Sequence, residues 1–137
     1  MRRNLPATVF DSYAVLALLF KETGAERVEE LLHAAAVADR PILITAMNWA
    51  EVLYKVERRE GRAGVDRTKR FERTLPLEVV SADRELAEAA AGFKANNKMS
   101  LADAFAAALA KQKKAILITG DPEFKQVEGE IKIGWLK

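Results

Sequence analysis

The chain has 137 residues, of which 50% are hydrophobic and 31% are charged, a composition typical of one ordinary folded domain. It contains no cysteine and a single histidine, His33, which excludes disulfides, thiolate zinc sites, cysteine nucleophiles and histidine-rich metal sites. The net charge of +2 is too small to indicate nucleic-acid binding by itself.

The N-terminal segment, MRRNLPATVFDSYAVLALLF, combines a basic start with an apolar run, as a secretory signal does. Asp11 interrupts the run, however, and no small-residue cleavage site follows Phe20. No stretch reaches the ~20 apolar residues that a membrane span needs. We therefore expect a cytoplasmic protein that does not enter a membrane.

Short apolar and β-branched runs alternate with helical patterns along the chain. Strands are predicted at 7–10, 42–45, 77–80, 115–119 and 131–133. Helices are predicted at 12–21, 25–38, 46–60, 65–74, 84–95 and 101–113, with a loop at 61–64 and a helical turn after Pro122. This alternation predicts an α/β fold of three layers, α/β/α, around a five-stranded parallel sheet. Without a linker or repeat, residues 1–137 are expected to form a single domain.

Several acids stand where a helix is expected to begin, and there an aspartate has a structural explanation. Asp121 precedes Pro122 as an N-cap precedes its first helical residue, and Asp11 is placed to cap the helix that follows it. Asp103 lies three residues after Ser100, the spacing of a capping box. Glu51 lies beyond the first turn of its helix, so it has either a specific partner or an exposed position.

Considered together, the acids predict a cation site. The carboxyl ends of parallel strands share one edge of the sheet, so Asp11, Asp121, Glu51 and Asp103 are expected in one crevice. Two carboxylates ~4 Å apart repel by about 4 kcal/mol at an effective dielectric near 20, and only a cation or a proton removes that cost. Oxygen ligands with room for water favour Mg²⁺ or Mn²⁺, and such a site suits phosphodiester hydrolysis.

Four blocks carry a resemblance to a known family: VFDSYAVLALLF, TAMNWAEVLYKV, KMSLADAFAAALAKQKKAILITGDPEF and IKIGWL. In order and spacing they resemble the PIN-domain ribonucleases of the VapC-like group, which are the toxins of bacterial and archaeal toxin–antitoxin pairs. The resemblance implies a five-stranded parallel sheet between helices. It also implies a metal-dependent site built on Asp11, Glu51, Asp103 and Asp121, with Ser12, Asn48 and Thr119 as supporting residues.

The expected chemistry is attack by a water on an RNA phosphodiester. Asp11, Asp103 and Asp121 are expected to hold the metal, directly or through water. Glu51 is either a further ligand or a general base, and one metal or two would fit. A covalent intermediate is not expected, because no Ser–His or Cys–His pair is present.

Residues 55–73 contain eight basic and four acidic residues. The pattern fits a solvated helix face with ion pairs, but beside an acidic crevice it also fits phosphate binding. Tyr13, two positions after Asp11, is an aromatic candidate for base stacking. The candidate RNA-binding residues are Tyr13, Arg58, Arg59, Arg62, Arg67 and Arg70, while His33 is expected to be a bystander.

Two protein partners are expected from the resemblance. One is an antitoxin, whose C-terminal segment would lie in a groove formed by the N-terminal helices and send a basic residue toward the acids. Apolar positions in 13–20 and 52–56 are available for that groove, although core packing explains them equally well. The other is a second copy of the chain, as a homodimer.

Two other functional classes remain open. An aspartate-based, Mg²⁺-dependent phosphatase also places an acid after its first strand, but it usually needs a second acid two residues later, where this chain has Tyr13. A non-catalytic RNA- or protein-binding module would use the acids only as helix caps.

Overall fold

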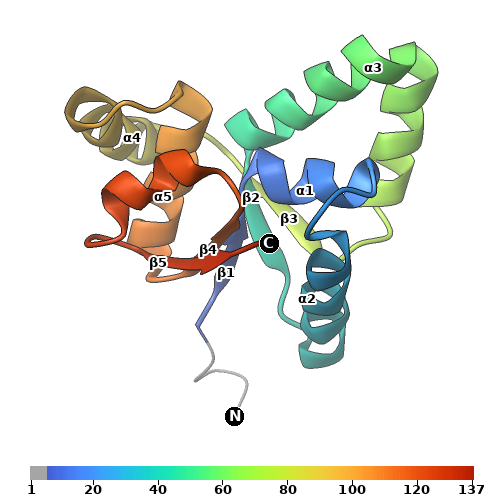
Figure 1. The fold of residues 1–137 in the computed structure, drawn as a ribbon, viewed down its shortest axis with the longest axis horizontal. Coiled ribbons are helices and arrows are strands. Elements are labelled where there is room, and N and C mark those ends of the chain that lie inside the picture. Colours follow the sequence, from blue (N-terminus) through green and yellow to red (C-terminus); the bar gives the residue numbers. More distant parts are fainter. Residues whose placement is uncertain (1–5) are drawn as a thin grey trace.

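The computed structural model describes residues 6–137 and contains one sheet with helices on both faces (Figure 1). Its strands are β1 (Thr8–Phe10), β2 (Ile42–Thr45), β3 (Leu77–Val80), β4 (Ile116–Thr119) and β5 (Lys132–Trp135). Their order is β3-β2-β1-β4-β5, and every neighbouring pair is parallel. The predicted five-stranded parallel sheet is confirmed. Residues 1–5 of the predicted domain lie outside the described residues.

The strand order changes direction at β1. The chain first builds outward through β2 to β3, then crosses back to place β4 on the other side of β1, where Val9 is in register with Leu117. The carboxyl ends of β1 and β4 therefore lie side by side at the point of reversal. In open parallel sheets this is the position at which ligands bind.

The helices form two layers. In chain order they are α1 (Ser12–Leu19), α2 (Ala25–Ala38), α3 (Ala46–Glu72), α4 (Arg84–Asn96), α5 (Leu101–Lys113) and the 3₁₀ helix η2 (Pro122–Val127). Figure 1 shows α1, α2 and α3 on one side of the sheet and α4 and α5 on the other. One buried cluster joins the sheet to α1–α3 through Phe10 and Ile44, and a second joins it to α4, α5 and η2 through Val9 and Leu117. These clusters confirm the three-layer architecture.

Two helices are buried because of their composition. Ala14 to Ala17 of α1 are all buried, as the apolar sequence of that segment predicts. In α5 every residue from Asp103 to Ala110 is buried, because its small alanines let the helix lie between the sheet and α4. Among residues 6–137, no helix is long and apolar enough to cross a membrane.

The break predicted at 61–64 is present but shorter than expected. Within α3 (Ala46–Glu72) two helical segments meet at a kink at Gly61, whose φ of 74° and ψ of −172° belong to a region that essentially only glycine enters. Because this one residue absorbs the change of direction, Gly64 lies buried in the following helical segment.

Several boundaries also differ from prediction by one or two residues, and two of these differences have a clear local reason. The first helix ends at Leu19 and not at 21, because Lys21 turns the chain with a positive φ of 54°. The last strand ends at Trp135, two residues beyond its predicted end, since Gly134 and Trp135 still pair with Ile118 and Thr119. A Cβ at position 134 would lie 2.7 Å from Ile118 Cδ1, so a larger residue there would require the end of the Ile118 side chain to shift.

Replacement of Gly61 by alanine should lower the free energy of unfolding by roughly 1 kcal/mol or more, because a Cβ is strained at this φ although no atom lies within 4 Å. Gly92→Ala is the matched control. It also meets no atom within 4 Å, but it lies inside α4 with an ordinary φ, so it should raise stability by roughly 0.5–1 kcal/mol. Urea unfolding measures both, and a stabilising Gly61→Ala would contradict the strain.

Candidate active site

Acids that are far apart in the sequence line one cavity at the carboxyl edge of the sheet. The cavity has a volume of about 510 Å³, and Asp11, Glu51, Asp103 and Asp121 all line it. Asp11 caps α1 directly after β1, and Asp121 caps η2 directly after β4. Glu51 projects from the second turn of α3, and Asp103 from the first turn of α5. The predicted convergence of the four acids is therefore present in the structure.

Asp11 is held at both carboxylate oxygens. The Ala14 amide donates to Oδ1 over 3.0 Å, and the Thr119 hydroxyl donates to Oδ2 over 2.5 Å. The same hydroxyl oxygen accepts from the Asp121 amide over 3.0 Å. Thr119, which is fully buried, therefore connects the acid after β1 to the acid after β4. This contact agrees with the supporting position predicted for Thr119.

Glu51 has specific partners. The hydroxyl of Ser12, which is itself buried, donates to Glu51 Oε1 over 2.6 Å. Lys55, one turn later on α3, places its Nζ 2.9 Å from Oε2. Burial lowers the pKa of Lys55, but its hydrogen bond to Glu51 and the charge of that carboxylate outweigh burial and raise the pKa above its ordinary value. Of the two open positions for Glu51, the partnered one is correct.

Three carboxylates offer ligand atoms for one ion. Oxygens of Asp103, Asp121 and Glu123 lie within 4.8 Å of one another. Glu123 was missed in the sequence, although an acid in the first turn after the Asp121–Pro122 cap was the available signal. Asp11 lines the same cavity but is not part of this group of three. Carboxylate oxygens are the donors that Mg²⁺ and Mn²⁺ prefer, so the residues present fit such an ion.

Burial and neighbouring charges raise the pKa values of two of the acids. Burial raises the pKa of Asp11 to about 7, with smaller increases from the charges of Asp121 and Glu51, although hydrogen bonds from Thr119 and Ala14 oppose the increase. The pKa of Asp103 rises to about 8, through burial first, then its hydrogen bond with Glu123 and the charges of the neighbouring acids. Without a cation, the cavity therefore retains protons near neutral pH.

Asn48 does not line the cavity. It is fully buried at the start of α3, where its backbone N–H donates to Thr45 Oγ1 over 3.0 Å and its side-chain Oδ1 accepts from that hydroxyl over 2.5 Å. Its side-chain Nδ2 has no hydrogen-bond partner among the described residues. Asn48 thus holds the first turn of the helix that carries Glu51 one turn later.

The structure brings only part of the predicted RNA-binding set to the cavity. Tyr13 and Arg59 line it, and so does Lys55, which was not in that set. The Arg59 guanidinium lies 4.0 Å from the centre of the Phe20 ring. The other predicted residues are exposed on α3 and do not line the cavity: Arg58, Arg62, Arg67 and Arg70. His33 is exposed on α2 and is likewise not a lining residue.

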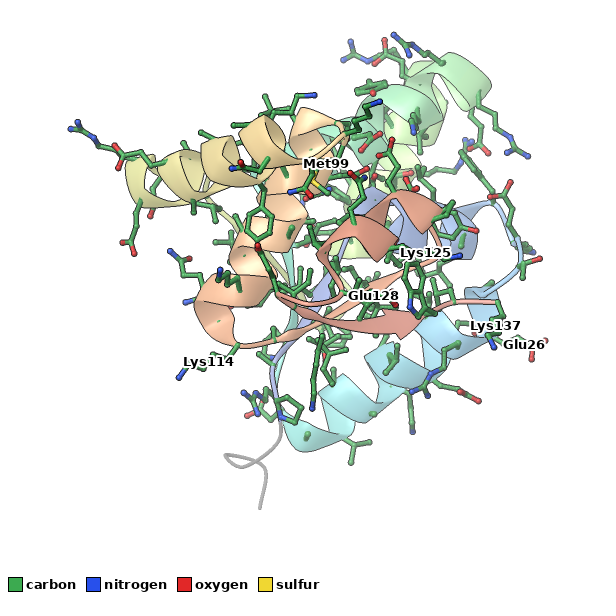
Figure 2. All side chains as sticks on the ribbon, turned by 60° about the vertical axis from the view of Figure 1, so that its left-hand side comes forward. Glu26, Met99, Lys114, Lys125, Glu128 and Lys137 are labelled. Carbon is green, nitrogen blue, oxygen red and sulfur yellow. The ribbon has the colours of Figure 1, made fainter. Side chains whose placement is uncertain are left out.

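A larger cavity of about 1130 Å³ lies away from the acids, between the end of α1, the start of α2 and the end of α3. Its apolar lining includes Leu18, Leu19, Phe71 and Leu75, and charged residues such as Glu26 and Lys137, which are labelled in Figure 2, line it as well. The apolar positions considered at 52–56 do not line this cavity. Val52 and Val56 are buried in the core, and Val56 also borders a smaller cavity of about 210 Å³ beside Leu19 and Phe20.

The raised pKa values predict that the metal-free protein loses stability as the pH rises. Asp11 and Asp103 have folded-state pKa values of about 7 and about 8, above the ordinary 3.8, so the folded state binds more protons than the unfolded state between these limits. In EDTA, the thermal midpoint should therefore decrease as the pH is raised from 5.5 to 8.5. Asp103→Asn should reduce this fall.

The matched control is Asp66→Asn, an exposed position on α3, which should leave the pH profile as in the original chain. A midpoint that rises over this range, or an unchanged profile in Asp103→Asn, would contradict the assigned pKa shifts. Thermal melts followed by circular dichroism at several pH values are sufficient.

Comparison with known proteins identifies the family. No curated protein matches the sequence. Among solved structures, the fold is similar to VapBC2 from Rickettsia felis bound to a promoter DNA fragment, with a TM-score of 0.75 and 14% identity over 96% of this chain and 99% of that chain. It is also similar to DNA-bound VapBC from Salmonella typhimurium, with a TM-score of 0.76 and 17% identity over 95% and 98%.

A third similar structure is VapC20 from Mycobacterium tuberculosis, described as a sarcin–ricin loop cleaving toxin, with a TM-score of 0.69 and 16% identity over 88% of this chain and 95% of that chain. At these identities the similarity concerns the fold. The family model of the PIN domain matches residues 8–130, nearly all of the chain. The chain therefore belongs to the PIN domain family.

Proposed function

We propose that this protein is a metal-dependent endoribonuclease of the cytoplasm and the toxin of a toxin–antitoxin pair. The observation that carries the proposal is the gathering of Asp11, Glu51, Asp103, Asp121 and Glu123 around one open cavity. Solved structures of similar fold support it, because two contain VapBC and a third is described as a sarcin–ricin loop cleaving toxin.

The acidic and basic residues at the cavity have different proposed roles. Asp103, Asp121 and Glu123 would hold Mg²⁺ or Mn²⁺, with Asp11 held beside them by Thr119. When bound, the cation supplies charge for the phosphate and lowers the pKa of a water. Lys55 and Arg59 would attract the RNA phosphates from the α3 side of the cavity.

Glu51 is placed to act as general base or as a further ligand. Ser12 and Lys55 each contact one of its two oxygens, each oxygen keeps a lone pair for a cation or a water, and release of Oε2 by Lys55 would free another. A salt bridge whose lysine is half exposed breaks at little cost, and an approaching phosphate offers Lys55 another anionic partner.

A phosphatase mechanism through Asp11 is less compatible with this geometry. A nucleophilic aspartate needs a free carboxylate oxygen that faces the substrate. Asp11 is 1% exposed, and its two oxygens accept hydrogen bonds from Ala14 and Thr119. Its position suits an acid that organises the site better than one that attacks.

We propose that the larger cavity receives the antitoxin. Leu18, Leu19 and Phe71 provide an apolar surface near the ends of α1 and α3, and Phe71 is 42% exposed. An amphipathic segment could place apolar side chains there while its polar side meets the charged rim. The homodimer remains a prediction that rests on family resemblance.

Purified protein should cleave a pool of cellular RNA into discrete products with Mg²⁺ or Mn²⁺, and EDTA should abolish the products. Asp103→Asn should reduce cleavage to the level seen with EDTA, because it removes one of the three converging carboxylates. Asp66→Asn, exposed on α3, is the control and should cleave as the original chain does. Folded, metal-loaded protein that binds RNA without cutting it would favour the non-catalytic module.

The metal site has its own test, independent of cleavage. At pH 8, Mn²⁺ at about 100 times its Kd should stabilise the protein by about 2.7 kcal/mol, because the ion binds the folded state alone. Glu123→Gln and Asp103→Asn should each reduce this gain, whereas Asp66→Asn should keep it. Thermal melts with and without Mn²⁺ measure the effect. An equal gain in all three variants would place the cation elsewhere.

A further inference from the structure

The proposed hydrolysis assigns no role to Tyr13, an aromatic residue that lines the acid cavity. Tyr13 is the second residue of α1 and follows Asp11 by two positions. It lines the cavity and is 40% exposed, although tyrosine is a large and partly apolar side chain. We propose that Tyr13 is the surface on which an unpaired RNA base stacks, next to the phosphate that is cut. This inference rests on the proposed ribonuclease function.

The position of the ring depends on Gly120. A Cβ added at Gly120 would lie 2.3 Å from Tyr13 Cε1, 2.5 Å from Cζ and 2.7 Å from the hydroxyl oxygen. The ring therefore packs directly on the backbone between Thr119 and Asp121. Its own backbone adjoins Ser12, the hydrogen-bond partner of Glu51. The ring is thus fixed relative to the acids from both β1 and β4.

The ring of Tyr13 is partly exposed and, within the part of the chain that the structure describes, is not covered by a cation. Other aromatic rings of this region carry a cation: the guanidinium of Arg59 lies 4.0 Å from the centre of Phe20, and that of Arg58 lies 4.7 Å from the centre of Tyr54. Among residues 6–137, no lysine or arginine makes such a contact with Tyr13. Aromatic side chains at this kind of site bind bases that are not paired, because stacking needs an exposed base face.

The arrangement lets the cavity bind a phosphate and the adjacent base at the same time. Lys55 and Arg59 line the cavity from α3, and Tyr13 lines it from α1, with the carboxylates in the same cavity. A single strand or a loop can place its phosphate near the carboxylates while the adjacent base turns onto Tyr13. A base inside a duplex is already stacked and paired, so it cannot turn onto Tyr13 while its phosphate lies near the carboxylates. Stacking on Tyr13 therefore requires the base beside the cut phosphate to be unpaired.

The test compares four variants on one RNA that the protein cuts. Tyr13→Leu should raise KM about tenfold or more, because base–aromatic stacking has an effect of this order. Tyr13→Phe keeps the ring and should recover most of the loss. Gly120→Ala should resemble Tyr13→Leu, because the new Cβ displaces the ring, while the backbone of Gly120 lacks the positive φ that would make alanine strained. Tyr54→Leu, at a 45% exposed ring outside the cavity, is the matched control and should not change KM.

An abasic substitution in the RNA separates stacking from a structural effect. At one nucleotide beside the cut, loss of the base should raise KM for the original chain but not further for Tyr13→Leu, since partners in contact give non-additive effects. An unchanged Mn²⁺ stabilisation in Tyr13→Leu shows that the acid site is intact. If every abasic position affects the original chain and Tyr13→Leu equally, the stacking role is wrong while the ribonuclease proposal stands.

If the original chain cuts no RNA, the proposed function fails, and the stacking role is then judged by binding alone. Single-stranded RNA with 2-aminopurine at successive positions reports stacking through loss of its fluorescence. Fluorescence loss with the original chain that disappears in Tyr13→Leu would support the platform. Equal fluorescence loss in both, or none in either, would overturn it.

Discussion

The burial of several carboxylates in one cavity is the constraint on which the rest of this structure depends. Asp11 and Asp103 are nearly inaccessible to solvent, and the charges of Asp121 and Glu51 add to the cost of ionising either one. Folding must bring these groups together before any cation can offset their charge. The favourable energy for this has to come from elsewhere in the fold, and two apolar clusters, one on each face of the sheet, are available to provide it.

Local hydrogen bonds hold the acids and begin the helices at the same time. The Asp11 carboxylate caps α1, and the Asp121 carboxylate caps η2 by accepting from the Glu123 amide. Ser100 caps α5 and so sets the first turn from which Asp103 projects. A capping role and a metal-binding role therefore do not compete, because a helix N-terminus stabilises a carboxylate and also directs it toward the carboxyl edge of the sheet.

The candidate site lies where the two helical layers meet above that edge. Asp11 and Glu51 come from α1 and α3 on one face, whereas Asp103, Asp121 and Glu123 come from α5 and η2 on the other. Thr119, at the end of β4, connects the two groups through its bonds with Asp11 and Asp121. The central strands thus act as the rigid element that sets the spacing of the acids.

The sequence by itself determined the alternation of strands and helices, the parallel sheet and the edge at which the acids gather. Those inferences succeed because apolar periodicity, caps and the rule that parallel strands share an edge are local or general properties. Asp11 and Glu51 could be named for the same reason, because each stands at a fixed position after a strand or a helix start, whereas Thr119 was named from the family resemblance. Even the bend in α3 had a local signal, Gly61, although the expected loop was too long.

Only the tertiary structure decided which side chains touch. It joined Ser12 and Lys55 to Glu51, added Glu123 to Asp103 and Asp121, and kept most of the basic residues of α3 away from the cavity. It also seated Tyr13 on Gly120, across more than a hundred residues of sequence. These contacts depend on helix rotation and on the crossover that places β4 beside β1, and no short stretch of sequence encodes either one.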